Sequence, residues 1–141
     1  MDPDAPAPVS APRKGPRILV VSPNRSHLAL LARRLGEEGY RIVAAESGAK
    51  ALTELGRTGA DLVLSELVME PMSGTDLTRA IRGEAAWRDL PIMLISGRSE
   101  PNGAVRAYEA GADDVILKPF HFEVLAAKID RRLTSARTLQ S

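Results

Sequence analysis

Five short apolar runs constrain the fold of this chain more than any other feature of its sequence. The runs are Ile18 to Val21, Ile42 to Ala45, Leu62 to Leu64, Ile92 to Ile95 and Val115 to Leu117. None of them alternates cleanly between apolar and polar residues, as a strand with one solvated face would. Strands that are covered by helices on both faces have continuous apolar sequences of this kind. The runs therefore predict five strands of a parallel sheet.

The segments between the runs have the periodicity of amphipathic helices. Leu28, Leu31 and Leu35 share one helical face in the first such segment, and similar stripes recur in the next four segments. Strands that alternate with helices over short connections give right-handed crossovers. A chain of 141 residues is too short for an eight-stranded barrel. The predicted fold class is therefore α/β, with a doubly wound, five-stranded parallel sheet.

Turn and cap residues mark the expected helix ends. Four glycines follow helical segments, where a left-handed residue is least costly for glycine: Gly39, Gly56, Gly83 and Gly111. Ser73 and Asp76 have the spacing of a capping box at the start of the third helix. Trp87 falls between the third helix and the fourth strand, where it is either a surface anchor or a cover on the edge of the core.

The chain divides into three expected parts: residues 1–16, 17–135 and 136–141. The first part contains five prolines among small and polar residues, and cannot bury enough apolar surface to offset the entropy of ordering. We expect it to be a disordered arm, with a proline-rich docking peptide as the alternative. The second part is the folded domain, and the third is a short tail.

Composition narrows the classes of partner and chemistry. Lysine and arginine number 19 against 18 acidic residues, so no strong net field favours nucleic acid or an anionic membrane. The absence of cysteine excludes thiolate chemistry and fits a reducing compartment. No apolar run approaches the roughly 20 residues that span a bilayer. We expect a cytoplasmic protein without a nucleic-acid or membrane partner.

In a doubly wound sheet the working crevice lies beyond the carboxyl ends of the strands. Four segments should meet there: Ser22 to Asn24, Ser65 to Val68, Ser96 to Gly97 and Lys118 to Phe120. His27 and His121 belong to no metal-ligand or nucleophile motif, so we expect both to be ordinary exposed histidines. No phosphate-binding glycine loop and no nucleophile elbow is present in the sequence.

The segment from Gly111 to Phe120, GADDVILKPF, is the most specific motif of the chain. It is supported by the opening run ILVV, by Met69 and Met72 ahead of Gly74, and by a Leu-Pro pair before the fourth strand. Over residues 17–133 the chain resembles a response-regulator receiver domain of two-component signalling. The resemblance implies the flavodoxin-like (βα)5 fold and a role in phosphorelay signal transduction.

Receivers place an acidic pair after the first strand, a phospho-accepting aspartate at the end of the third, and a Thr or Ser after the fourth. They also place an aromatic switch residue on the fifth strand and a lysine at its end, before a proline whose peptide bond is commonly cis. The matching positions here are Ser22, Pro23, Glu66, Ser96, Val115, Lys118 and Pro119. Ser96, Lys118 and Pro119 keep the family pattern, whereas the acidic pair, the acceptor and the aromatic residue are replaced.

These replacements matter because Mg²⁺ is normally held by carboxylates, phosphate oxygens and water. Ser22 and Pro23 supply no carboxylate, and Glu66 faces the ammonium of Lys118, so the cleft is close to neutral. We therefore expect no metal site, no cofactor and no enzyme activity. The expected function is that of a degenerate pseudo-receiver, an atypical, phosphorylation-independent module for protein binding in signal transduction.

Other interpretations of the cleft remain open at this stage. Glu66 either imitates a phosphorylated acceptor or serves as the ion-pair partner of Lys118. A competent, stand-alone receiver that is phosphorylated on Glu66 is the main alternative function. An anion or nucleotide sensor that uses Lys118, Ser22 and helix N-termini is a third. Ser96 could swing toward Glu66 or only cap the local backbone.

Receivers commonly contact partners through the fourth helix, fifth strand and fifth helix. The candidate residues on this face are Arg106, Tyr108, Asp113, Asp114, Lys128, Arg131 and Arg132. Charges of both signs on one face can pair across a two-fold axis, so signalling proteins or a second copy of the chain are the expected partners. Val124 departs from the glutamate that is usual in the receivers that dimerise in this way. A solvated charged face is the alternative interpretation.

Overall fold

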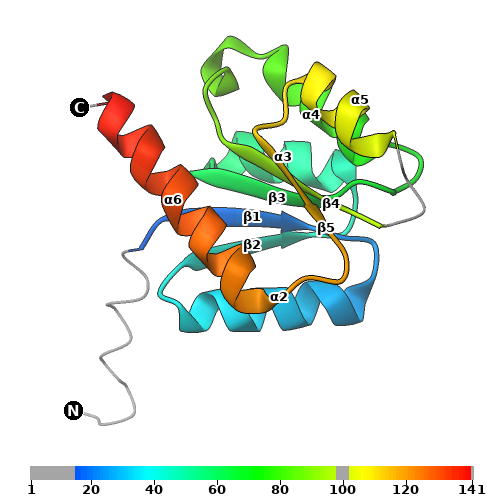
Figure 1. The fold of residues 1–141 in the computed structure, drawn as a ribbon. Coiled ribbons are helices and arrows are strands. Elements are labelled where there is room, and N and C mark those ends of the chain that lie inside the picture. Colours follow the sequence, from blue (N-terminus) through cyan, green and yellow to red (C-terminus); the bar gives the residue numbers. More distant parts are fainter. Residues whose placement is uncertain (1–14, 98–101, 141) are drawn as a thin grey trace, which may run out of the picture.

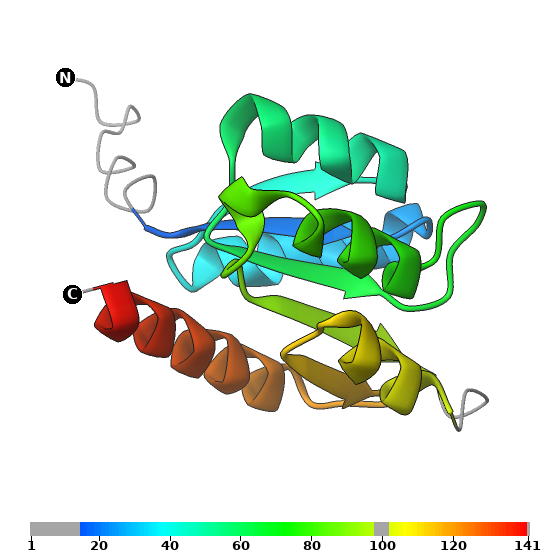
Figure 2. The ribbon, with the colours of Figure 1, turned by 90° about the horizontal axis from the view of Figure 1, so that it is seen from above.

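The computed structural model describes residues 15–97 and 102–140 as a three-layer α/β arrangement (Figure 1). Its strands are β1 Arg17–Val21, β2 Arg41–Ala45, β3 Leu62–Glu66, β4 Ile92–Ser96 and β5 Asp114–Leu117. All neighbouring strands pair in parallel, in the order β2-β1-β3-β4-β5. Figure 2 shows β2 and β5 at the two edges of this sheet. The predicted fold class and strand positions are confirmed.

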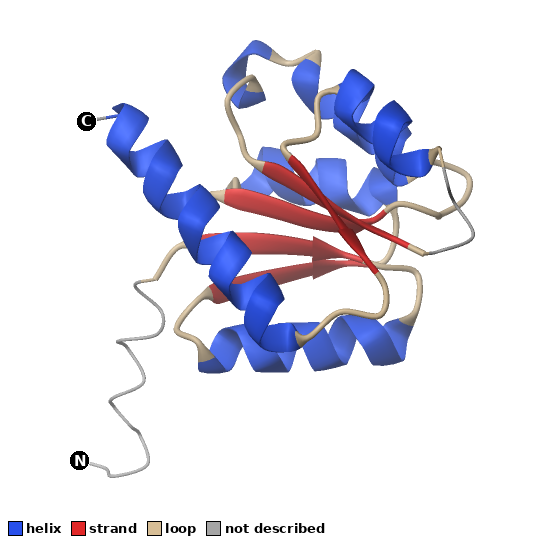
Figure 3. Cartoon of the chain, viewed as in Figure 1, coloured by secondary structure: helices blue, strands red, loops and turns tan. Residues whose placement is uncertain are grey.

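Helices cover both faces of the sheet (Figure 3). The described α-helices are α2 Arg25–Glu37, α3 Gly48–Thr58, α4 Gly74–Arg82, α5 Gly103–Ala110 and α6 Phe122–Gln140, with a short 3₁₀ helix, η2 Ala85–Trp87. The leucines of α2 and the apolar stripe of α6 pack on one face of the sheet. Helices α3, α4 and α5 pack on the other face. The predicted stripes of α2, α3, α4 and α6 lie mainly in the core, but Val105 and Tyr108, which were expected on the core face of α5, are 56% and 49% exposed, and Ala107 is buried there instead.

Burial along the strands follows their position in the sheet. The central strands β3 and β4 are buried at every residue, and β1 at all but its first. The edge strands β2 and β5 are only partly buried. This pattern explains why apolar runs without alternation mark the strands: the central strands contact a helical layer on each side.

Helix ends agree with the sequence in some places and differ in others. Ser73 and Asp76 form the predicted capping box, and Gly111 ends α5 with φ 113°. Gly56 was predicted to follow α3 but lies inside it, and the helix instead ends at Gly59 with φ 73°. The helix continues to Thr58, whose Oγ1 donates to the carbonyl of Glu54, and Gly59 N donates to the carbonyl of Leu55. Gly83 follows α4 as predicted, but in a right-handed conformation.

The predicted N-terminal arm lies mostly outside the described residues. Its last two residues, Gly15 and Pro16, accept hydrogen bonds from Arg41 of β2 through their carbonyl oxygens. No helix in the described part of the chain is long and apolar enough to cross a membrane.

Candidate functional site

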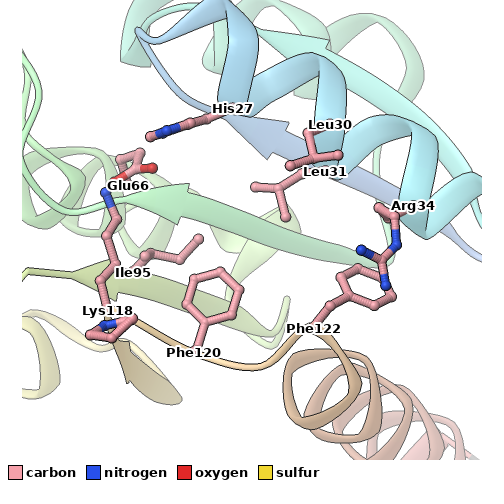
Figure 4. A pocket seen from close by; sticks show the side chains of 10 residues that line it. His27, Leu30, Leu31, Arg34, Glu66, Ile95, Lys118, Phe120 and Phe122 are labelled. Atoms are coloured by element: carbon pink, nitrogen blue, oxygen red, sulfur yellow. Dashed lines mark ion pairs between the residues drawn. The ribbon is translucent and has the colours of Figure 1, made fainter.

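Glu66 and Lys118 form an ion pair at the carboxyl edge of the sheet. Glu66 ends β3 and Lys118 follows β5, and the distance from Lys118 Nζ to Glu66 Oε1 is 2.9 Å (Figure 4). The Glu66 side chain is 10% exposed, whereas that of Lys118 is 39% exposed. The strand ends hold both residues in place, because Leu67 N donates to Ile95 O and Lys118 N donates to Ser96 O. The cleft therefore contains a carboxylate that already has a cationic partner.

Close packing of α4 fixes the backbone beside Glu66. Gly74 begins α4, and its amide donates to the carbonyl of Leu67 at 2.8 Å. A Cβ atom at Gly74 would overlap the carbonyl oxygen of Glu66 and approach Leu67 Cα to 2.9 Å. Only glycine allows the helix to begin this close to the strand. The loop between β3 and α4 also contains a cis peptide bond between Glu70 and Pro71.

The positions of the family's acidic pair form a turn into α2. Ser22 is fully buried, and its hydroxyl accepts a hydrogen bond from Asn24 N at 3.1 Å. Asn24 is the N-cap of α2 and accepts from His27 N through Oδ1. Pro23 lies exposed between them. These residues shape the backbone and supply no carboxylate to the cleft.

The two switch positions make local hydrogen bonds. Ser96 Oγ donates to the carbonyl of Gly97 at 3.2 Å, which is the capping alternative among the sequence interpretations. The amide of Val115 donates to the hydroxyl of Tyr108 at 3.2 Å. Neither residue has a hydrogen bond to Glu66. The Lys118–Pro119 peptide bond is cis, as the resemblance implies.

The residues of this cleft do not fit a divalent cation. Glu46, which follows β2 at the same edge of the sheet, pairs with Arg25 at 3.2 Å and with Lys50 at 4.0 Å. Sequence reasoning missed this carboxylate, because no motif marks it. Within residues 15–97 and 102–140, no three His, Asp or Glu side chains are grouped so that they could hold a metal ion. Magnesium is normally held by one or two carboxylates together with phosphate oxygens and water, and here Glu46 and Glu66 both already have cationic partners.

The predicted partner face is brought together, and three of its charged residues pair with one another. Lys128 Nζ lies 3.7 Å from Asp114 Oδ2, and Arg132 lies 4.0 Å from the same oxygen. Asp113 pairs with Arg82 of α4 at 2.9 Å and so belongs to the fold. Four exposed apolar residues are also present on α5, β5 and α6: Val105, Tyr108, Leu117 and Val124. Arg106 and Arg131 are exposed on the same helices.

A cavity of about 590 Å³ lies between α2 and the segment that joins β5 to α6. Leu30, Phe120 and Arg34 line it, and the Glu66–Lys118 pair stands at one end (Figure 4). Sequence reasoning missed this cavity. One signal was available, because Leu30 is a leucine outside the buried stripe of α2.

The remaining residues that the sequence singled out have ordinary surroundings. Trp87, in η2, is partly buried and packs against the core cluster under α3, α4 and α5, so it covers an edge of the core. His27 and His121 are both exposed. His27 lines the cavity beside Glu66, which its sequence context did not suggest.

Comparison with known proteins gives a consistent family match. Residues 18–130 match the model of the response regulator receiver domain. The chain is 32% identical over 126 residues to the transcriptional regulatory protein KdpE of Mycobacterium tuberculosis, a match covering 87% of this chain and 54% of KdpE. It is 34% identical over 112 residues to the sensory transduction protein RegX3 of Mycobacterium bovis, covering 79% of this chain and 48% of RegX3. The chain thus spans about half the length of these relatives.

The fold of one solved structure matches this chain over most of both chains. The signal receiver domain of a signal transduction histidine kinase from Syntrophus aciditrophicus is 34% identical, with a TM-score of 0.81. The match covers 86% of this chain and 92% of that domain.

Proposed function

We propose, from the premise that this chain belongs to the response regulator receiver family, that its signalling role does not depend on phosphorylation. One observation carries the proposal. The carboxylate at the acceptor position, Glu66, is paired with Lys118 at 2.9 Å, and the acidic-pair positions hold Ser22 and Pro23. The retained lysine therefore faces a permanent carboxylate in a cleft that lacks the ligands for Mg²⁺.

Electrostatics support this reading of the cleft. A divalent cation binds where negative charge exceeds positive charge, but Glu66 and Lys118 cancel one another at contact distance. Transfer of a phosphoryl group from acetyl phosphate to Glu66 would release acetate and form an acyl phosphate. Negative charge on the transferred group would have no metal ion to neutralise it. The ion pair also explains why Lys118 is kept, since it compensates a carboxylate that is 10% exposed.

Function would then reside in binding to other proteins. The apolar residues of α5, β5 and α6 are between 48% and 57% exposed, and β5 is an edge strand. Asp114, Lys128 and Arg132 pair within this face, so a partner would contact the apolar side chains beside charges that already have partners. We propose a cytoplasmic signalling protein, or a second copy of this chain, as that partner. The matched relatives bear names of transcriptional and sensory regulators, which is compatible with this role.

The phosphorylation claim is tested by intact mass measurement after incubation with acetyl phosphate and Mg²⁺. We expect no added phosphoryl group on the natural sequence. A variant that rebuilds the family pattern, Ser22→Asp/Pro23→Asp/Glu66→Asp, is the positive control and should gain one. A phosphoryl adduct on Glu66 of the natural chain would contradict the proposal and restore the alternative of a competent receiver.

The partner claim is tested on the apolar face. Sedimentation of the natural chain and of Leu117→Asp/Val124→Asp would show whether the face joins two copies. Co-purified proteins compared between the same two forms would show whether it binds another protein. We expect one of these associations to be lost in the variant, and retained in Glu37→Lys on α2 as the control. An association that is lost in Glu66→Gln while the fold is kept would instead support Glu66 as a substitute for a phosphorylated acceptor.

A further inference from the structure

The cavity between α2 and the β5–α6 segment has the size of a small-molecule site. Its volume of about 590 Å³ falls within the range of roughly 300–1,000 Å³ that is typical of ligand pockets. Its wall is mainly apolar, with Leu30 and Leu31 of α2 facing Phe120 across the opening (Figure 4). Leu30 is 48% exposed. Single exposed leucines are common, but here the exposed apolar surface continues into a concave wall.

Charges are distributed unequally along this cavity. At one end the carboxylate of Glu66 is neutralised by Lys118. At the other end Arg34 holds its guanidinium 4.1 Å from the ring centroid of Phe122. His27 of α2 lies beside Glu66, and Arg34 follows it by seven residues, a rise of about 10 Å along the helix that separates the two ends of the cavity. Among the described residues, Arg34 has no carboxylate partner, so its charge is available to a ligand.

We propose that this cavity binds a small amphiphilic monocarboxylate. The carboxylate pairs with Arg34, and the apolar body covers Leu30 and Phe120. Arg34 is favoured over Lys118 as the anion site, because Lys118 is already paired and Glu66 beside it repels a second carboxylate. The planar fork of an arginine also matches two carboxylate oxygens at once. Such a ligand could regulate the chain in place of phosphorylation. The proposal itself does not require that the chain be phosphorylation-independent.

A titration of the ¹⁵N-labelled chain with 4-phenylbutyrate and with its neutral amide tests this proposal. Both probes should give saturable amide shifts in α2, at Lys118 and in residues 120–122. The acid should bind about tenfold more tightly than the amide, because it adds a charge-assisted hydrogen bond. In Arg34→Gln this advantage of the acid should disappear. Arg33→Gln, at the exposed neighbouring position on α2, is the matched control and should keep it.

A second variant tests the apolar wall independently of charge. Leu30→Trp places a larger ring in the cavity at a position that is already half exposed, so the fold should be kept. It should weaken the binding of both probes at least tenfold, whereas Val105→Trp, at a position 56% exposed on α5, should weaken neither. Absence of saturable shifts at the cavity, equal affinity for acid and amide in the natural chain, or unchanged binding in Leu30→Trp would each overturn the proposal.

Discussion

Two ion pairs of equal length stand at opposite ends of the sheet, and they are built differently. Arg82 and Asp113 meet at 2.9 Å where β4 and β5 begin, and Glu66 and Lys118 meet at 2.9 Å where β3 and β5 end. Arg82 also donates to three backbone carbonyls, those of Trp87, Leu90 and Gly111. The second pair has no such support from hydrogen bonds in the described part of the chain.

The first ion pair has a structural role, whereas the second connects few other groups of the fold. Asp113 accepts a further hydrogen bond from the amide of Ile92, so the first pair joins α4, η2, β4 and the turn before β5. Glu66 and Lys118 connect only two strand ends at the rim of a cavity. Distance alone does not distinguish these roles, whereas the number of backbone groups that depend on each cation does.

Removal of Arg82 should have the largest effect. Arg82→Met leaves Asp113 without its cation and removes the donor of the Leu90 and Gly111 carbonyls, whereas Trp87 O keeps the amide of Leu90, so we expect a loss of about 3 kcal/mol in the free energy of unfolding. Urea denaturation followed by circular dichroism measures it. Arg79→Met, one turn earlier on α4, removes only an exposed pair of 3.6 Å with Asp76 and should cost less than about 0.5 kcal/mol. Similar losses in both variants would contradict the distinction.

Disruption of the cleft pair should give a smaller and asymmetric effect. Lys118→Met leaves a carboxylate that is 10% exposed, and we expect it to cost about 2 kcal/mol. Glu66→Gln leaves a lysine that is 39% exposed and can reach water, so about 0.5–1 kcal/mol is expected. The same denaturation series measures both variants. If Glu66→Gln proved the more costly of the two, the buried carboxylate would not be the group that needs compensation.

The comparison also explains what the sequence could predict. The strands followed from buried apolar runs, and the meeting of Glu66 with Lys118 followed from parallel strands that end at one edge. These inferences depend on the periodicity of apolar residues and on the parallel direction of the strands, both of which follow from short segments of the sequence. Asp113 was instead expected on a partner face, because its motif gives no sign of Arg82, which lies 31 residues earlier.

Features that depend on side chains from distant elements could not be predicted. The cavity requires Leu30 and Arg34 of α2 to lie opposite Phe120, a contact that periodicity does not encode. The end of α3 lies at Gly59 and not at Gly56, because one glycine lowers helix propensity by only about 1 kcal/mol and does not by itself end a helix.

The turn at Gly111, which packs against the Arg82 side chain, offers a sharper test of the Arg82–Asp113 pair. Gly111 has φ 113°, and a Cβ atom there would lie 2.9 Å from Arg82 Cγ, so Gly111→Ala should cost about 1–2 kcal/mol. Gly36→Ala is the control, because it lies in α2 with no atom within 4 Å of the added carbon. It should stabilise the chain by up to about 1 kcal/mol. Thermal unfolding of both variants gives the sign directly, and a stabilising Gly111→Ala would show that the turn is free to relax.

The smallest effect should come from the hydroxyl at the end of β4. Ser96 is buried, and within the described residues its hydroxyl donates to the adjacent carbonyl of Gly97, so Ser96→Ala should cost less than about 1 kcal/mol. In amide spectra the change should be confined to residues next to Ser96. A hydroxyl that coupled the cleft to the partner face would also shift Tyr108 and Val115, which are joined by a hydrogen bond on that face. Shifts at those two residues would show that a change in the cleft alters β5. The cleft would then be coupled to the partner face, and it would not differ from the Arg82–Asp113 pair in the number of elements that it connects.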